Sequence, residues 1–98
     1  MRYEIILSPE AIEDLRSLAA HWRARVRDAI ETHLRHEPTK ESKSRIKHLR
    51  GVSHPQFRLR VGEIRVFYDV SPDAVEILVI VPESEAEAWL DRVGEHEE

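Results

Sequence analysis

Arginine side chains alternate with apolar residues on two adjacent segments in the second half of the chain. The segment 57–61 reads FRLRV and the segment 64–70 reads IRVFYDV. A period of two is typical of strands that bury one face, so the arginines should share the other face. A guanidinium stays charged, and its planar fork of N–H donors fits a phosphate. The pattern therefore predicts an anion-binding surface formed by Arg58, Arg60 and Arg65.

A two-residue turn, Gly62-Glu63, joins these two predicted strands, and glycine in its first position suits a type II′ turn. That turn pairs Arg60 with Arg65 and leaves Arg58 on the same face. Like charges directly opposite one another destabilise a sheet. A sequence that keeps such a cost does so most often for function, here for a bound anion. The alternative is neutralisation by nearby carboxylates, and the candidates are Glu63, Asp69 and Glu76.

The charge of the chain is strongly segregated, although its net value is only -4. Residues 40–65 contain eight basic and two acidic residues, a net charge of +6. Residues 66–98 contain one basic and ten acidic residues, a net charge of -9. This asymmetry favours a site for a polyanion or an acidic partner over a loop that the cations merely solvate. The loop residues expected to join the surface are Lys43, Arg45, Lys47 and Arg50.

Two amphipathic segments precede the basic loop. Ser8 and Pro9 form a helix start, and they follow a predicted strand over residues 2–7. Apolar residues then recur at helical spacing, but the stripe shifts phase near His21. The two segments could form one helix or two, and we favour an antiparallel helical hairpin with a tight break near that residue. Pro38 ends the second helix, because proline cannot continue the hydrogen-bond ladder.

The segment 75–81 is apolar at nearly every position, as is typical of a central strand covered on both faces. The remaining expected elements are an edge strand or turn over 46–51, a loop over 52–55, a helix over 83–93 and a frayed acidic tail over 95–98. The order β-α-α-β-β-β-α predicts an α+β fold in a single domain, residues 1–98. We expect two layers, a small antiparallel sheet with the helices, including the N-terminal helical hairpin, packed on one face.

Composition excludes several classes of protein. The chain has no cysteine, so disulfides and thiolate metal sites are ruled out. Its six histidines lack the HExxH pattern and other ligand spacings, so we expect neither a metal nor another cofactor. Trp22 and Trp89 lie on apolar helical stripes and are expected in the core. With no apolar run near membrane length and no signal-peptide pattern, we expect a soluble, cytoplasmic protein.

The run KHLRGVSHPQFRLRVGEIRVFYDV resembles the signature of RelE/ParE toxins, the toxin halves of bacterial type II toxin–antitoxin pairs. The opening YEIILSPEAIEDLRSL also resembles the first strand and helix of that family. The resemblance spans nearly the whole chain. The matching elements are the turn Leu49-Arg50-Gly51, the strand Phe57-Arg58-Leu59-Arg60, the turn Gly62-Glu63 and the strand Arg65-Val66-Phe67-Tyr68.

The resemblance implies a compact α+β fold and a cognate antitoxin that wraps the toxin with extended and helical segments. It also implies one of two activities. RelE-like members cut mRNA in the ribosomal A site, and ParE-like members inhibit DNA gyrase without cutting anything. In the first case the partners are the ribosome and mRNA, and Arg58, Arg60 and Arg65 match the basic strand residues that bind RNA phosphate and stabilise the transition state. The RNA-binding loop residues are then Lys43, Arg45, Lys47 and Arg50.

The end of the chain departs from the RNase members, which carry a C-terminal arginine and tyrosine. This chain reads PESEAEAWL over residues 82–90, and Tyr68 falls on the core face of its strand. Arginine is a poor general base because it stays protonated, so Lys47 or His48 would have to supply one. We favour an mRNA interferase, a ribosome-dependent endoribonuclease. The alternatives are a ParE-like gyrase inhibitor and a toxin-fold module that has lost its activity.

Overall fold

A five-stranded sheet forms the centre of the computed structural model, which describes residues 1–96. Its strand order is β1-β6-β5-β4-β2. The strands of this sheet are β1 Glu4–Leu7, β2 Ile46–His48, β4 Phe57–Val61, β5 Ile64–Val70 and β6 Ala74–Pro82. The helices are α1 Pro9–Ser17, α2 Ala20–Leu34 and α3 Glu83–Val93. A separate two-stranded ribbon pairs β3 Val52–His54 with β7 Glu95–His96.

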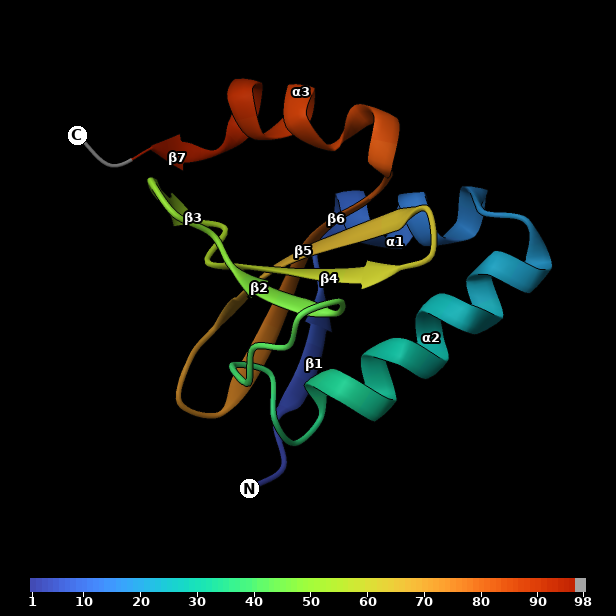
Figure 1. The fold of residues 1–98 in the computed structure, drawn as a ribbon. Helices are drawn as coiled ribbons and strands as arrows, with labels where there is room; N and C mark the ends of the chain where they lie inside the picture. The colour runs from blue at the N-terminus through green and yellow to red at the C-terminus, as the bar shows by residue number, and fades with distance from the viewer. Residues whose placement is uncertain (97–98) are drawn as a thin grey trace.

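The sheet is mixed, so the expected α+β class is confirmed but the purely antiparallel sheet is wrong. Strands β2, β4, β5 and β6 form an antiparallel meander, whereas β1 pairs with β6 in parallel. The two helices carry the chain from β1 to the opposite edge of the sheet, and the meander then returns to it (Figure 1). The apolar pattern of β6 indicated burial on both faces, but it carries no information on the direction of the neighbouring strand.

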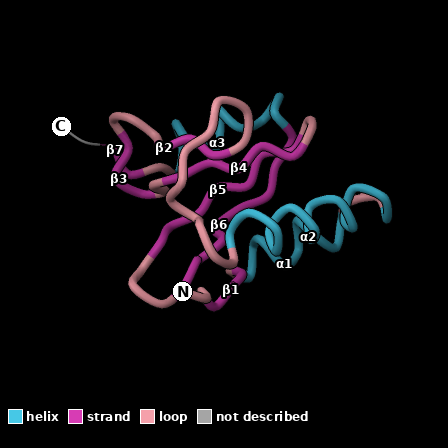
Figure 2. The backbone as a smooth tube through the Cα atoms, turned by 60° about the horizontal axis from the view of Figure 1, so that its bottom comes forward, coloured by secondary structure: helices cyan, strands magenta, loops and turns pink. Residues whose placement is uncertain are grey.

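The helices cover both faces of the sheet, which corrects the expectation that all of them share one face. Helices α1 and α2 pack on one face, and α3 lies across the other (Figures 1 and 2). The contact under α3 centres on the stacked rings of Phe67 and Trp89, whose centroids lie 5.3 Å apart. The face that carries Arg58, Arg60 and Arg65, called the arginine face below, also carries the apolar residues Phe67 and Val79. These two residues need such a cover. Burying them favours a third layer.

The predicted helical hairpin is present, but its break lies earlier than expected. Ser8 caps α1 by accepting a hydrogen bond from the Ala11 N–H at 3.0 Å. Helix α1 ends at Ser17 and α2 begins at Ala20, so His21 lies inside α2. The guanidinium of Arg23 donates to carbonyls at the C-terminus of α1, and this satisfies groups that the helix itself leaves unpaired. None of the helices in the described part of the chain is long and apolar enough to cross a membrane.

The β4–β5 hairpin has the predicted register, with Arg60 opposite Arg65 and Val61 opposite Ile64. Gly62 has a φ of 59°, the positive value that a type II′ turn requires at its first central residue. Within residues 1–96, the residues with a positive φ are both glycines. The indole of Trp22 packs directly against this turn, since a Cβ added to Gly62 would lie 2.7 Å from its ring. Glycine is therefore required both for the backbone conformation and for the close approach.

Two peripheral expectations are modified. The edge strand over 46–51 is confirmed as the shorter β2, which pairs with β4. The expected loop over 52–55 is wrong in part, because Val52–His54 forms β3. Its partner β7 includes Glu95 and His96, which were expected in a frayed tail, whereas residues 97–98 of that tail lie outside the described residues.

Candidate nucleic-acid interface

Two rows of cross-strand neighbours carry the basic side chains of the arginine face. Lys47 of β2 pairs with Arg58 of β4, and Arg58 pairs on its other side with Phe67 of β5. In the next row Arg60 pairs with Arg65. Directly opposed residues share a face and have their Cβ atoms about 5 Å apart. The fold therefore brings Lys47 together with the predicted arginines on the face that α3 partly covers.

Arg65 is the most buried of the three arginines, with 5% of its surface exposed. Its guanidinium donates to the carbonyl oxygens of Gly62 at 2.8 Å and Ile64 at 3.1 Å. It also forms an ion pair with Glu83, the first residue of α3, at 3.0 Å. Arg65 thus joins the hairpin turn to the start of α3. The neutralising carboxylate is Glu83, not one of the residues considered from the sequence, because α3 was expected on the other face.

Arg58 is partly buried, and its Nε–H has no hydrogen-bond partner within residues 1–96. Burial lowers the pKa of Arg58, as do the charges of Arg65 and Arg60, while Glu83 opposes the shift. A buried donor without an acceptor costs about 1–3 kcal/mol. An anion seated here would satisfy the free donor and offset the mutual repulsion of the guanidinium groups. The unpartnered donor and the neighbouring positive charges therefore favour an anion at this position.

The loop cations are only partly brought to this surface. Lys47 is exposed beside Arg58, and Arg50 is exposed in the turn after β2. Lys43 is exposed in the loop before β2. Arg45 lies on the α2 side of the sheet, near His33. Burial of the His33 ring lowers the pKa of His33, and the charge of Arg45 lowers it further. The compact basic surface therefore consists of Lys47, Arg58 and Arg60, and it is called the basic surface below.

His48, which was weighed as a general base, and Tyr68, which was expected in the core, both lie away from the basic surface. The ring of His48 packs on Phe57, with centroids 4.9 Å apart, and Phe57 belongs to the core under α1 and α2. Tyr68 is fully buried, as expected, and its hydroxyl donates to the Pro38 carbonyl at 2.6 Å. Burial raises the pKa of Tyr68 far above its ordinary value. Neither side chain can serve a phosphate bound on the basic surface.

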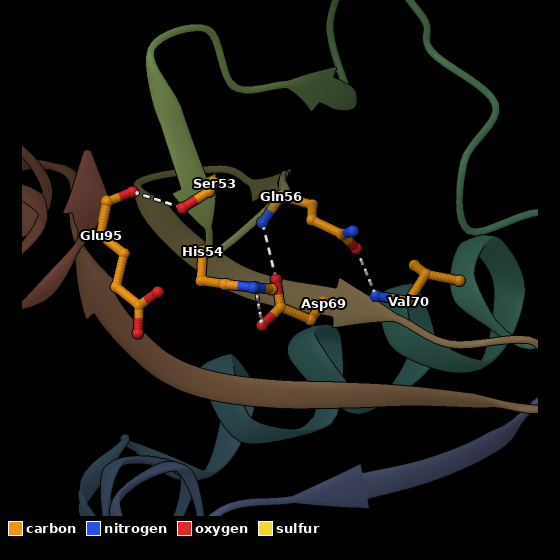
Figure 3. A network of polar contacts seen from close by, with 6 residues as sticks. All are labelled: Ser53, His54, Gln56, Asp69, Val70 and Glu95. Carbon is orange, nitrogen blue, oxygen red and sulfur yellow. Dashed lines mark hydrogen bonds and ion pairs between the residues drawn. The ribbon is translucent and has the colours of Figure 1, made fainter. Parts of the chain in front are cut away.

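A histidine–aspartate pair at the other end of the same face was missed from the sequence (Figure 3). The Nδ1 atom of His54 lies 3.1 Å from Oδ2 of Asp69, and Oδ1 of Asp69 accepts the Gln56 N–H at 2.8 Å. Fifteen residues separate the pair along the chain, but the hairpin register could have indicated it. Extending the correctly predicted pairing by one step places Asp69 beside Gln56, two residues from His54.

Asp69 was considered as a neutralising partner for the arginines, and the structure engages it elsewhere. Both of its carboxylate oxygens are occupied by His54 and by the backbone of Gln56 (Figure 3). Glu76 is exposed on β6 and pairs in register with Asp69, not with an arginine. Within residues 1–96, no group of three or more histidine and acidic side chains is arranged to hold a metal ion.

Several solved structures resemble this fold. The toxin–antitoxin complex RelBE2 from Mycobacterium tuberculosis matches with 25% identity and a TM-score of 0.68, over 84% of this chain and 99% of that one. The archaeal RelE–RelB complex from Pyrococcus horikoshii matches with 27% identity and a TM-score of 0.63, over 84% and 96%. A free double arginine-to-alanine mutant of Escherichia coli RelE matches with 19% identity and a TM-score of 0.70, over 95% and 99%.

A search of the curated proteins finds no match. The family model described as the ParE toxin of the type II toxin–antitoxin system parDE matches residues 5–87, which include the sheet, the helical hairpin and the start of α3. This match covers most of the chain, and the fold agrees with it. The chain therefore belongs to the ParE toxin family within the RelE/ParE superfamily of type II toxins.

Proposed function

We propose that this toxin is an mRNA interferase, a ribosome-dependent endoribonuclease that holds RNA phosphates on the basic surface. The observation that carries the proposal is the unpartnered, buried Nε–H of Arg58 amid like charges. RNA cleavage requires stabilisation of the charge that develops on the scissile phosphate. Arg58 and Arg60 supply this stabilising positive charge, with Lys47 beside Arg58. Arg65 holds the hairpin in place through its ion pair with Glu83.

A cognate antitoxin is the second partner in this proposal. Two of the similar solved structures, from Mycobacterium tuberculosis and Pyrococcus horikoshii, are complexes of a toxin with its antitoxin. Membership of a type II toxin family supports the same arrangement here. Co-expression with the product of the adjacent gene should abolish growth arrest and yield a complex that co-purifies.

The test is primer-extension mapping of mRNA after induction of the chain in growing bacteria. We expect discrete cuts within translated codons for the wild type, and their loss in Arg58→Ala. Arg16→Ala is a matched control, because Arg16 is an exposed arginine of α1 whose recorded ion pair is with Glu13 on the same helix. It should cut like the wild type. Unchanged cutting by Arg58→Ala would show that the basic surface is not the site.

A gyrase inhibitor is the second candidate function. The family model that matches is that of ParE, and the segment 82–90 lacks the arginine and tyrosine of the RNase members. Arrested growth with intact mRNA and reduced gyrase supercoiling would favour this candidate and contradict the nuclease. Normal growth with intact mRNA would favour a module that has lost its toxic activity.

A further inference from the structure

The side of the sheet that α3 covers also contains a cavity, at the end away from the basic surface. The cavity has a volume of about 570 Å³ and lies where the start of α1, β6 and the end of α3 meet. On β5 it is lined by Asp69, which follows Phe67, whereas Arg65 precedes Phe67 on that strand. The stacked rings of Phe67 and Trp89 therefore separate the cavity from the arginines, and its own lining determines what it can bind.

Much of this lining is apolar. Leu78 of β6 is half-buried, and Val93 of α3 is 49% exposed. Trp89 is 4% exposed, and within residues 1–96 its indole N–H has no hydrogen-bond acceptor. Apolar surface in water and a buried donor without an acceptor both cost free energy in the unbound protein. A ligand that covers Val93 and brings an acceptor to the indole removes both costs.

The charged groups of the cavity are carboxylates, together with His54. Both carboxylate oxygens of Asp69 are already engaged. Glu10 and Glu95 are exposed, and within residues 1–96 no ion pair engages either side chain. No lysine or arginine of the described chain lines the cavity with them. The surrounding segment, residues 66–98, has a net charge of -9, so the local potential attracts cations and repels RNA phosphate.

Glu95 is held in place by the two-stranded ribbon of β3 and β7. It is the cross-strand neighbour of His54, and the Ser53 hydroxyl donates to its carbonyl oxygen at 3.0 Å (Figure 3). The contact of 3.1 Å between Nδ1 of His54 and Asp69 ties this ribbon to β5. Glu95 is therefore positioned at the cavity before any ligand binds, and a positioned group loses less entropy on binding.

We propose that this cavity binds a basic, apolar segment of a partner protein. The ammonium or guanidinium group of the segment pairs with Glu10 and Glu95, and a neighbouring apolar side chain packs on Leu78 and Val93. A backbone carbonyl of the segment supplies the acceptor that the Trp89 indole lacks. The docking site goes beyond the proposed nuclease and needs no RNA on the basic surface, since the two sites select opposite charges.

The test is an NMR titration of the full chain, labelled with nitrogen-15, with a capped leucine-lysine-leucine tripeptide. The chain has two tryptophans, so its spectrum contains two indole N–H signals, and Trp22→Phe assigns them. We expect a saturable shift of the Trp89 signal, whereas the signal of Trp22, which packs on the β4–β5 turn, should not move. Glu10→Gln and Glu95→Gln should each weaken binding about 2–5-fold, the usual size for an exposed ion pair.

Matched controls separate the charge from the apolar contact. Glu87→Gln removes an exposed carboxylate of α3 that does not line the cavity, so it should bind the peptide like the wild type. A leucine-glutamate-leucine peptide should not bind, and a glycine-lysine-glycine peptide should bind more weakly than the leucine peptide. Equal affinity for either control peptide, or unchanged affinity in both Glu10→Gln and Glu95→Gln, would overturn the proposal.

Two further results would also overturn it. The first is the absence of a saturable Trp89 shift with the leucine-lysine-leucine peptide. The second is a Trp89 shift that follows protein concentration without any peptide, since the occupant would then be a second copy of this chain. Neither result bears on mRNA cleavage, so the proposed nuclease stands or fails by its own test.

Discussion

Replacing Glu83 with glutamine should weaken the fold and strengthen anion binding at the same time. Glu83 lies 3.0 Å from the buried guanidinium of Arg65. Among residues 1–96, the substitution leaves that charge with the carbonyls of Gly62 and Ile64 as its partners. Breaking a fully buried ion pair costs about 3–5 kcal/mol. The Glu83 side chain is 66% exposed, so solvent screens the pair and the expected cost falls to about 1–2 kcal/mol.

The assay is urea unfolding followed by tryptophan fluorescence. Small domains have m values of about 1–3 kcal/mol/M, so the midpoint should fall by about 1 M. Glu87→Gln is the matched control, an exposed glutamate of the same helix, and should leave the midpoint unchanged. Loss of Glu83 also removes a negative charge that favours protonated Arg58, so affinity for single-stranded RNA should rise at low salt. An unchanged midpoint for Glu83→Gln would refute the compensating role of this carboxylate.

Two further substitutions test features of the fold. Gly62→Ala should destabilise the protein by about 1–2 kcal/mol because of the positive φ, and further because the new Cβ would collide with Trp22. Gly51→Ala should incur only the first cost, since its φ is 73° and nothing lies within 4 Å. Equal thermal midpoints for the two variants would contradict this. Burial, with a smaller contribution from Glu85, raises the pKa of Asp14 despite its hydrogen bond from the Ile80 N–H. Asp14→Asn should therefore be more stable than the wild type at pH values above the raised pKa of Asp14. The difference should vanish as the pH falls below 3.8, and a constant difference across pH would be evidence against the burial cost.

The hairpin could be predicted from the sequence because its information is local. A glycine-first turn sets the pairing, and the pairing sets which side chains share a face, so the opposition of Arg60 and Arg65 followed directly. The cap at Ser8 and the end of β6 at Pro82 are local in the same sense. Local signals of this kind identify elements and registers with few alternatives.

The placement of α3 could not be predicted, since it depends on contacts between distant segments. The apolar stripe of α3 shows that the helix packs on something, and only the position of Phe67 on the arginine face indicates which face needs cover. The partner of Arg65 was missed for that reason. The His54–Asp69 pair was missed because β3 was expected to be loop, where no register can be assigned.

The parallel pairing of β1 with β6 has a consequence for synthesis of the toxin. Glu4 pairs with Ala74, and Leu7 pairs with Ile77, so the first strand meets its partner seventy residues later. Contacts of such long sequence separation form slowly, because the intervening chain must be ordered first. During translation the first strand and the helical hairpin remain without a complete sheet until β6 has left the ribosome. Arg58 and Arg60 therefore emerge before the sheet that positions them can close.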